Sequence, residues 1–365
     1  MSSKHAGKIG IYGFMGLKNE IPCTRVLMTE KRGTFPSLTL MPDGEIISMY
    51  RGENNHVGEG TLLLSRSRDG GLNWNDPVTV FSKPGMDVRN QCIGLAKNGN
   101  LACLYTERIS EPRSWKVFQA VSEDQGKTWE SKELPEPNGY HWISPYTHGN
   151  ILQRRNGDLL TSCFSMKGTT EYVQQEAKEY YSFILISKDN GYTWEIRGEA
   201  LQGWTDEVDF TENNCGDLLA YIRGGGRFFG AIWLSYDLER STKGWSEPRM
   251  VAFDGLSPAI SSWITNEDML LTVGCRQYPY GARGIVSHDS GYDFSWDSQI
   301  VFSDTDGDGK TRYDNGYPST VILPDGYAFT AWYRSKSIPS NFEGTEDYYC
   351  AEGCRYKIED LMNAL

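Results

Sequence analysis

Residues 36–50 read PSLTLMPDGEIISMY: an alternating apolar run, an Asp-Gly turn and a second apolar run. Asn-Gly or Asp-Gly between alternating runs is a strong hairpin signal, because primed two-residue turns need positive φ at both central residues. The sequence therefore predicts six β-hairpins, about 51 to 59 residues apart, because the same phrase returns in the segments 92–105, 150–164, 209–222, 259–273 and 318–333.

A second motif, Ser-x-Asp-x-Gly-x-x-Trp, is interleaved with the hairpins. It is complete at 67–74, 122–129 and 187–194, with weaker copies at 235–245 and 287–296. Ser and Asp side chains hydrogen-bond turn backbone and Trp covers a sheet edge, so we interpret these boxes as structural turns. Two hairpins per repeat make a four-stranded sheet, and six repeats predict an all-β, six-bladed β-propeller with Asp-box hairpins. We expect residues 1–365 to form a single domain, with an N-terminal strand around 23–28 completing the last blade.

Composition excludes several classes of protein. The 365-residue chain is 39% hydrophobic and 13% aromatic, too apolar for a disordered protein. Its formal charge of -12 argues against a nucleic-acid partner, and its apolar runs are too short for a membrane span. Without a signal peptide the chain as written is expected to be cytoplasmic, or secreted if a leader was trimmed. Eight scattered cysteines predict free thiols, and we expect neither a metal nor a cofactor.

These boxes resemble the Ser-x-Asp-x-Gly-x-Thr-Trp boxes of the sialidase superfamily, and the resemblance extends over nearly the whole chain. In a propeller, the first strand of each blade lines the central channel, and its start shares one face with the end of the second strand. Counting back from each turn places these residues at the first-strand starts: Thr34 and Phe35, Arg89 and Asn90, His148, Glu207, Ser257 and Pro258, and Tyr317.

Arginines recur at the ends of the second strands. Counting forward from the turns gives Arg51, Arg108, Arg223, Arg276 and Arg334. Converging arginines repel each other unless an anion or acidic partner lies among them, and guanidinium groups bind carboxylates bidentately. The pattern indicates an anionic ligand, most simply an acidic carbohydrate, and we include Arg89 among the candidate binding residues.

The resemblance assigns roles to several of these residues. Tyr317, in Gly316-Tyr317-Pro318-Ser319, resembles the family's nucleophile, and Glu207 with Arg223 resembles its Glu partner and second arginine. Arg276 and Arg283 are both candidates for the third arginine. A neutral phenol suits a substrate that carries a carboxylate on the reacting carbon, because a carboxylate nucleophile would be repelled. Tyr317 could also be a simple channel-lining residue.

Two positions depart from the family pattern. Thr34 stands where the resemblance implies the first arginine, and Arg32 lies two residues earlier, a shift of roughly 7 Å along a strand. The aspartate that the family uses as general acid is missing from residues 51–57, where His56 or Glu53 could supply a proton. Residues 304–309 imitate the start of a calcium loop, but Asn315 stands at its twelfth position, so we interpret the segment as a polar turn.

These observations leave three hypotheses. The first is a sialidase-like, exo-acting glycoside hydrolase on sialic acid or a related acidic sugar. The second is a uronate-cleaving polysaccharide lyase, with Tyr317 and either His148 or His56 moving the proton. The third is a non-catalytic propeller that binds acidic glycans.

Overall fold

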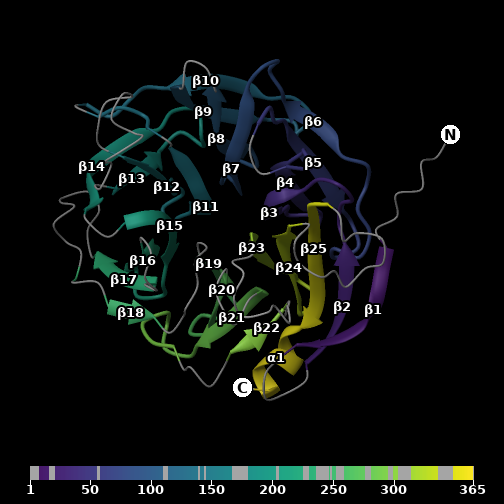
Figure 1. The fold of residues 1–365 in the computed structure, drawn as a ribbon. Coiled ribbons are helices and arrows are strands. Elements are labelled where there is room, and N and C mark those ends of the chain that lie inside the picture. The colour runs from purple at the N-terminus through teal and green to yellow at the C-terminus, as the bar shows by residue number, and fades with distance from the viewer. Residues whose placement is uncertain are drawn as a thin grey trace. The chain divides into compact units, whose positions relative to one another are not determined.

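A computed structural model describes most of the chain, in sixteen stretches (Figure 1). The residues described are 8–15, 21–55, 58–109, 114–138, 140–143, 145–166, 180–202, 205–224, 230–235, 246, 249–251, 259–275, 281–294, 299–302, 314–335 and 348–364. Within them the secondary structure is antiparallel β-sheet apart from one short helix, α1 (Ile358–Ala364), so the prediction of an all-β fold is confirmed.

The chain divides into two compact units. Unit 1 contains Met1–His56, Leu63–Thr79 and Ala252–Leu365, and unit 2 contains Val57–Leu62 and Val80–Val251. The sheets of unit 2 are β7 (Asp87–Leu95), β8 (Leu101–Ile109), β9 (Ser114–Ser122) and β10 (Glu130–Leu134); β11 (Tyr146–Gln153), β12 (Leu159–Met166), β13 (Tyr180–Ser187) and β14 (Glu195–Gln202); and β15 (Thr205–Glu212), β16 (Leu218–Gly224), β17 (Gly230–Ser235) and β18 (Arg249–Val251).

The other three sheets belong to unit 1, except that the strand residues Leu62, Val80 and Phe81 fall in unit 2. They are β3 (Thr34–Leu40), β4 (Ile46–Arg51), β5 (Leu62–Ser67) and β6 (Val78–Phe81); β19 (Ala259–Trp263), β20 (Met269–Cys275), β21 (Gly281–Ser287) and β22 (Ile300–Val301); and β23 (Asn315–Ile322), β24 (Tyr327–Arg334) and β25 (Cys350–Lys357) with β2 (Ile21–Leu27) and β1 (Lys8–Met15).

The sheet that contains β23 uses both ends of the chain. Its order is β1-β2-β25-β24-β23, and Cys23–Leu27 of β2 pair with Glu352–Tyr356 of β25. Figure 1 shows β2 beside β25, with β1 on its outer side. This sheet therefore has five strands where the prediction gave four, because the segment before β2 folds back on it and adds β1 at its edge.

The hairpin turns differ in type from the prediction. In the first one, Gly44 N–H donates to Met41 O at 2.9 Å and Met41 N–H donates to Glu45 O at 2.8 Å. Gly44 has a φ of +88°, while Pro42 and Asp43 do not have positive φ. The loop is therefore a type I turn followed by a left-handed glycine, not a primed two-residue turn. Gly99, Gly157, Gly216 and Gly326 repeat this geometry, which needs glycine at one position only.

The Asp boxes are turns held by their own side chains, as predicted. In the first box Ser67 Oγ donates to Asp69 Oδ1 at 2.9 Å and accepts from Gly71 N–H at 2.8 Å. Trp74 Nε1 donates to Gly71 O at 2.9 Å, and the indole is buried. The boxes at 122–129 and 187–194 repeat these contacts. The Ser and Asp side chains therefore make their hydrogen bonds within the turn and stabilise its shape.

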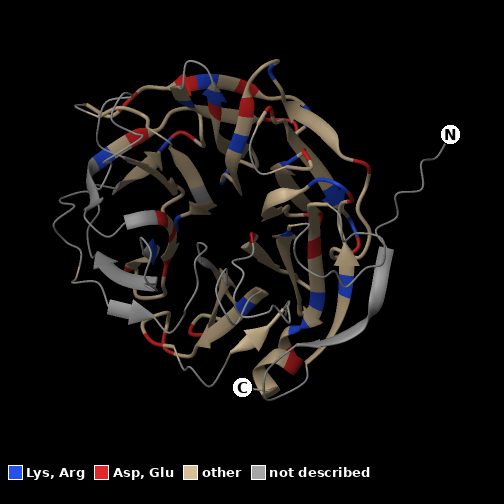
Figure 2. Ribbon diagram, viewed as in Figure 1, with Lys and Arg blue, Asp and Glu red and all other residues tan. Residues whose placement is uncertain are grey.

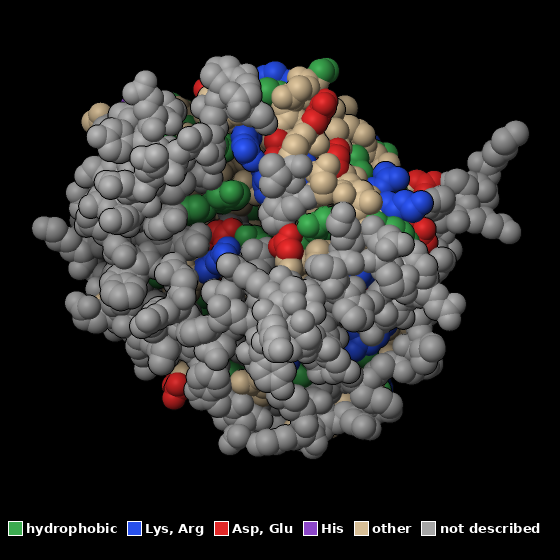
Figure 3. All heavy atoms as spheres, in the orientation of Figure 1, with side chains coloured by type: hydrophobic (Ala, Val, Ile, Leu, Met, Phe, Trp, Pro, Cys, Tyr) green, Lys and Arg blue, Asp and Glu red, His purple; other side chains and the backbone are tan. Residues whose placement is uncertain are grey.

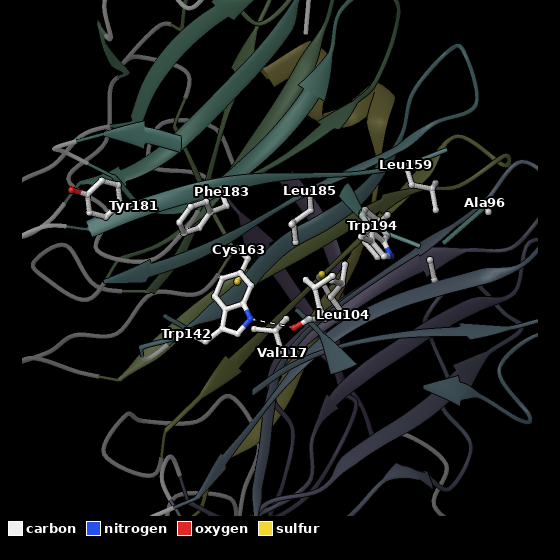
Figure 4. Close-up of a cluster of buried hydrophobic side chains, with 14 residues drawn as sticks. Ala96, Leu104, Val117, Trp142, Leu159, Cys163, Tyr181, Phe183, Leu185 and Trp194 are labelled. Atoms are coloured by element: carbon white, nitrogen blue, oxygen red, sulfur yellow. Dashed lines mark hydrogen bonds between the residues drawn. The ribbon is translucent and has the colours of Figure 1, made fainter. Parts of the chain in front are cut away.

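Hydrophobic side chains fill the space between neighbouring sheets. In unit 2, Leu104 and Val117 of one sheet pack with Cys163 and Phe183 of the next, and Trp194 of an Asp box closes the cluster (Figure 4). Burying such a side chain contributes about 1.5–3 kcal/mol each, so the inter-sheet layer holds the strand ends in fixed positions. Seven cysteines of the described chain are free thiols, and six of these are buried. None of the described helices is long and apolar enough to cross a membrane.

Candidate functional site

The residues predicted at the starts of the first strands lie there wherever the structure describes them. Asn90, His148, Glu207 and Tyr317 fall within the first four residues of β7, β11, β15 and β23, and Thr34 begins β3. Within unit 2, β11 packs against β7 and β15; within unit 1, β23 packs against β3. Each unit therefore gathers its candidate residues on the same ends of adjacent inner strands.

These strand starts are irregular in a repeated way. The pairing register shifts near the start of β3, β7, β11, β15 and β23, in each case within the first seven residues of the strand. Three bulky or polar residues in these bulges have positive φ: Phe35 at +59°, Asn90 at +54° and Tyr317 at +48°. Such conformations cost about 1–3 kcal/mol each and cluster at functional sites. Sequence reasoning located the residues but not the bulges.

Tyr317 lies in an aromatic environment in unit 1. Its ring centroid is 4.7 Å from that of Phe35, in an edge-on arrangement, and 5.9 Å from that of Tyr333. Tyr317 is half-buried, whereas Phe35 and Tyr333 are buried. One residue of the aromatic cluster therefore keeps access to solvent.

Glu207 and Arg223 form an ion pair in unit 2. Arg223 Nη1 donates to Glu207 Oε2 at 2.6 Å, with the Glu207 side chain 3% exposed and that of Arg223 15% exposed. The spacing of sixteen residues brings them together because β15 and β16 are paired and Glu207 sits in the shifted stretch opposite Arg223. A buried carboxylate is thus held by a guanidinium that still reaches solvent.

Four of the other candidate arginines are more deeply buried than arginines that bind a ligand in an open channel would be. Residue exposure is 0% for Arg51, 4% for Arg89, 1% for Arg283 and 2% for Arg334. Arg89 pairs with Asp87 at 3.2 Å, and Arg334 Nε donates to Glu352 Oε1 at 3.0 Å. With Glu207 beside Arg223, the protein itself supplies acidic partners, so the recurrence of arginine does not by itself require an external anion.

Arg51 holds the loop that follows β4. Its Nη1 donates to Asn55 O at 2.5 Å and to Asn55 Oδ1 at 2.9 Å, and Glu53 Oε2 lies 3.9 Å away. Arg51 is also the cross-strand partner of Thr34, the position where the first arginine was expected. Glu53 is partly exposed in this loop, and His56 lies outside the described residues.

Further predicted positions have limited descriptions. Arg276, Ser257, Pro258 and residues 304–309 lie outside the described part of the chain, and only the backbone of His148 is described, in β11. Arg283 lies in β21, the third strand of its sheet, opposite Val273 and Val301. In the described segments no group of three His, Cys, Asp or Glu residues could hold a metal ion.

Sequence reasoning missed the carboxylates that hold Arg89 and Arg334. Asp87 could have been found, because it lies two residues before Arg89 and so on the same face of a strand. Glu352 carried no such signal, because β25 follows a long segment without a repeat motif. Burial raises the pKa of the neighbouring Cys350 thiol well above its ordinary value, and this thiol donates to Glu352 Oε1 at 3.6 Å.

Charge is mixed throughout the described residues. Figure 2 shows acidic and basic positions on the same strand, as in β25, which carries Glu352, Arg355 and Lys357. Among the described side chains on the face drawn in Figure 3, acidic and basic groups lie among hydrophobic ones. Within the described stretches, charged side chains therefore occur as individual acidic and basic groups close to one another.

Comparison with known proteins gives one family and several related folds. The model of the BNR repeat-like domain matches residues 44–329. A sialidase of Paraclostridium sordellii is 26% identical over 234 residues, a match that covers 56% of this chain and 55% of that protein. The chain thus spans a little over half the length of this curated relative.

Solved structures share the fold at low identity. A protein of unknown function from Dyadobacter fermentans superposes with a TM-score of 0.74 at 21% identity, covering 91% of this chain and 98% of that one. The NanB sialidase of Streptococcus pneumoniae superposes with a TM-score of 0.68 at 13% identity, covering 97% and 71%. The predicted β-propeller of the sialidase type is confirmed.

Proposed function

Because the chain belongs to the BNR repeat-like domain family, within the sialidase superfamily of β-propellers, we propose that it is a sialidase-like glycoside hydrolase acting on an acidic carbohydrate. The P. sordellii relative is itself a sialidase, which supports this class of reaction. The substrate we propose is an exo-linked sialic acid or a related acidic sugar.

The observation that carries this proposal is the Glu207–Arg223 pair. A carboxylate that is 3% exposed is expensive to bury, and it is retained here beside a partly exposed guanidinium. A purely structural pair would be served as well by two buried groups, as in Arg334 and Glu352. The partial exposure of Arg223 fits a guanidinium that also binds the carboxylate of a sugar.

Tyr317 is the proposed nucleophile. Its phenol oxygen would bond to the anomeric carbon as the bond from that carbon to the leaving oxygen breaks. The phenol proton would pass to Glu207, and the leaving oxygen would take a proton from Glu53 or His56. Water would then bond to the anomeric carbon as the bond from that carbon to the tyrosine oxygen breaks. The proton of the water would pass to Glu53 or His56, and Glu207 would return its proton to the phenol oxygen. Arg223, with Arg276 or Arg283, would hold the substrate carboxylate.

The remaining arginines have a supporting role in this proposal. Arg51, Arg89 and Arg334 are held by Asn55, Asp87 and Glu352, and they would fix the strand ends that carry the substrate-binding groups. Their own contact with substrate remains a prediction from sequence.

The direct test is release of the fluorescent aglycone from an aryl α-sialoside. Wild type is expected to turn over, and Tyr317→Phe to lose activity by at least about 100-fold, because the nucleophilic oxygen is gone. Tyr105→Phe is the matched control: the Tyr105 hydroxyl hydrogen-bonds Ser131 Oγ at 2.8 Å within the β7–β10 sheet, and activity should be kept.

Full activity of Tyr317→Phe on the sialoside would refute the assignment of Tyr317 as nucleophile.

A second substrate separates the competing reactions. Ultraviolet absorbance of an unsaturated product from a uronate polysaccharide, with no sialoside turnover, would indicate the lyase instead. Retention on an acidic glycan column without any product would indicate a binding protein.

A further inference from the structure

Two buried aromatic rings contact Tyr317 in unit 1. Phe35 contacts both tyrosines, with ring centroids 4.7 Å from Tyr317 and 5.1 Å from Tyr333, and the Tyr317–Tyr333 separation is 5.9 Å. The three rings thus form one closed set of contacts, which we call the Tyr317 cradle. A phenol within such a set has few orientations open to it.

One carboxylate ties this cradle to the surrounding loops. Tyr333 hydroxyl donates to Asp314 Oδ1 at 2.5 Å, and Tyr349 hydroxyl donates to Asp314 Oδ2 at 3.3 Å. Tyr349 N–H in turn donates to Asn54 Oδ1 at 2.8 Å, in the loop that contains Glu53. Asp314 therefore links Tyr333 to a second tyrosine and, through it, to the loop after β4.

The backbone shows that this arrangement is imposed. Phe35 and Tyr317 have φ values of +59° and +48°, and both lie in bulges, of β3 and β23. Immediately beyond the bulges, Leu38 N–H donates to Ser319 Oγ at 3.0 Å and fixes one strand to the other. Bulges re-aim side chains, and strained residues persist where the surroundings over-determine them. Here the two residues with positive φ are the ones whose rings are in contact.

We propose that Asp314 is a positioning residue for Tyr317. By holding the Tyr333 hydroxyl it fixes the Tyr333 ring, and this ring with Phe35 sets the direction of the Tyr317 phenol. The inference rests on the proposed function, in which the phenol oxygen must attack one carbon along a defined path. Asp314 acts through Tyr333 and is not itself a catalytic residue.

Two variants test the proposal by kinetics on the aryl α-sialoside. Tyr333→Phe keeps the ring but removes the anchor, and Asp314→Ala removes the acceptor from both phenols. Each should lower kcat by roughly 10–100-fold, since misplacement of a reacting group by about 1 Å costs on this order. KM should stay within about twofold of wild type, because uniform binding is unchanged. Asp314→Asn, which keeps one acceptor oxygen, should fall between Asp314→Ala and wild type.

A second readout does not depend on turnover. In protein with 13C-labelled tyrosine rings, the Tyr317 signal, assigned with Tyr317→Phe, should report a slow ring flip in wild type and a faster one in Asp314→Ala. Tyr105→Phe should leave both the flip and kcat unchanged. Circular dichroism identifies any variant that fails to fold, in which case Tyr333→Phe and Asp314→Asn decide.

The two proposals fail in different ways. If Tyr317→Phe is inactive but Asp314→Ala and Tyr333→Phe match wild type in kcat and ring flip, the cradle is refuted and the proposed function stands. If Tyr317→Phe is fully active, the assignment of Tyr317 as nucleophile is refuted, and the ring-flip measurement still decides whether Asp314 orders Tyr317. A rise of KM by roughly 10–100-fold with unchanged kcat in Asp314→Ala and Tyr333→Phe would also refute the positioning role of Asp314.

Discussion

The ion pair between Arg334 and Glu352 gives a sharp stability prediction. Their side chains are 2% and 1% exposed, and Arg334 Nε lies 3.0 Å from Glu352 Oε1. Removing one partner of a buried pair leaves an uncompensated charge and costs about 3–5 kcal/mol. Glu352→Gln and Arg334→Met should therefore each destabilise by this amount. With a urea m-value of about 3 kcal/mol/M, the unfolding midpoint falls by roughly 1–1.7 M.

The double variant decides whether the cost comes from the unpaired charge. With both charges gone, no ion remains buried alone, so the double variant should lose less than the sum of the singles, by up to about 3 kcal/mol. Urea unfolding followed by tryptophan fluorescence measures all three. Glu133→Gln is the exposed control: its partner Lys116 is even closer, at 2.6 Å, but the side chains are 50% and 47% exposed, so the midpoint should not move. Additive single losses, or singles as mild as the control, would refute the reasoning.

Two further predictions concern turns. A Cβ on Gly71, at a φ of +94°, would lie 2.2 Å from Phe329 Cδ2, whereas a Cβ on Gly44, at a φ of +88°, would meet nothing within 4 Å. Gly71→Ala should therefore lower the free energy of unfolding by about 2–5 kcal/mol, and Gly44→Ala by about 1–2 kcal/mol. Urea midpoints measure both, and equal losses of stability would contradict the prediction. Partial burial alone would raise the pKa of Asp69, but hydrogen bonds from Asn73 and Ser67 outweigh it and hold the pKa below 3.8. A carboxyl whose pKa is lower in the folded than in the unfolded protein stabilises the fold above the unfolded pKa, and this stability is lost as the pH falls through the folded pKa. Wild type should therefore lose more stability on acidification than Asp69→Asn, and equal losses in the two proteins would contradict the prediction.

Local signals in the sequence predicted the sheets and the strand ends. The turn glycines and Asp boxes act within a few residues, so they placed Glu207, Tyr317 and Arg334 correctly at the ends of their strands. The turn type was wrong because Asp-Gly serves a type I turn with a left-handed glycine as well as a primed turn.

Features that depend on packing between strands could not be predicted. The bulges at Phe35 and Tyr317 arise where β3 and β23 contact each other, far apart in sequence. The partner of Arg334 lies on β25, a strand without any repeat motif, and the fifth strand came from sequence outside the repeats. The pattern of arginines predicted an anionic ligand, but the protein supplies acidic partners to Arg89, Arg223 and Arg334 from its own side chains.

The pairing of β2 with β25 sets a minimum time for folding during synthesis. The two strands are separated by more than 300 residues, since β2 ends at Leu27 and β25 begins at Cys350. At about 5–20 residues per second, a ribosome needs roughly 15–65 s to make the intervening chain. During that interval Ile21–Leu27 has an open edge that can pair with other chains, so the nascent protein is most exposed to aggregation until Cys350–Lys357 emerges.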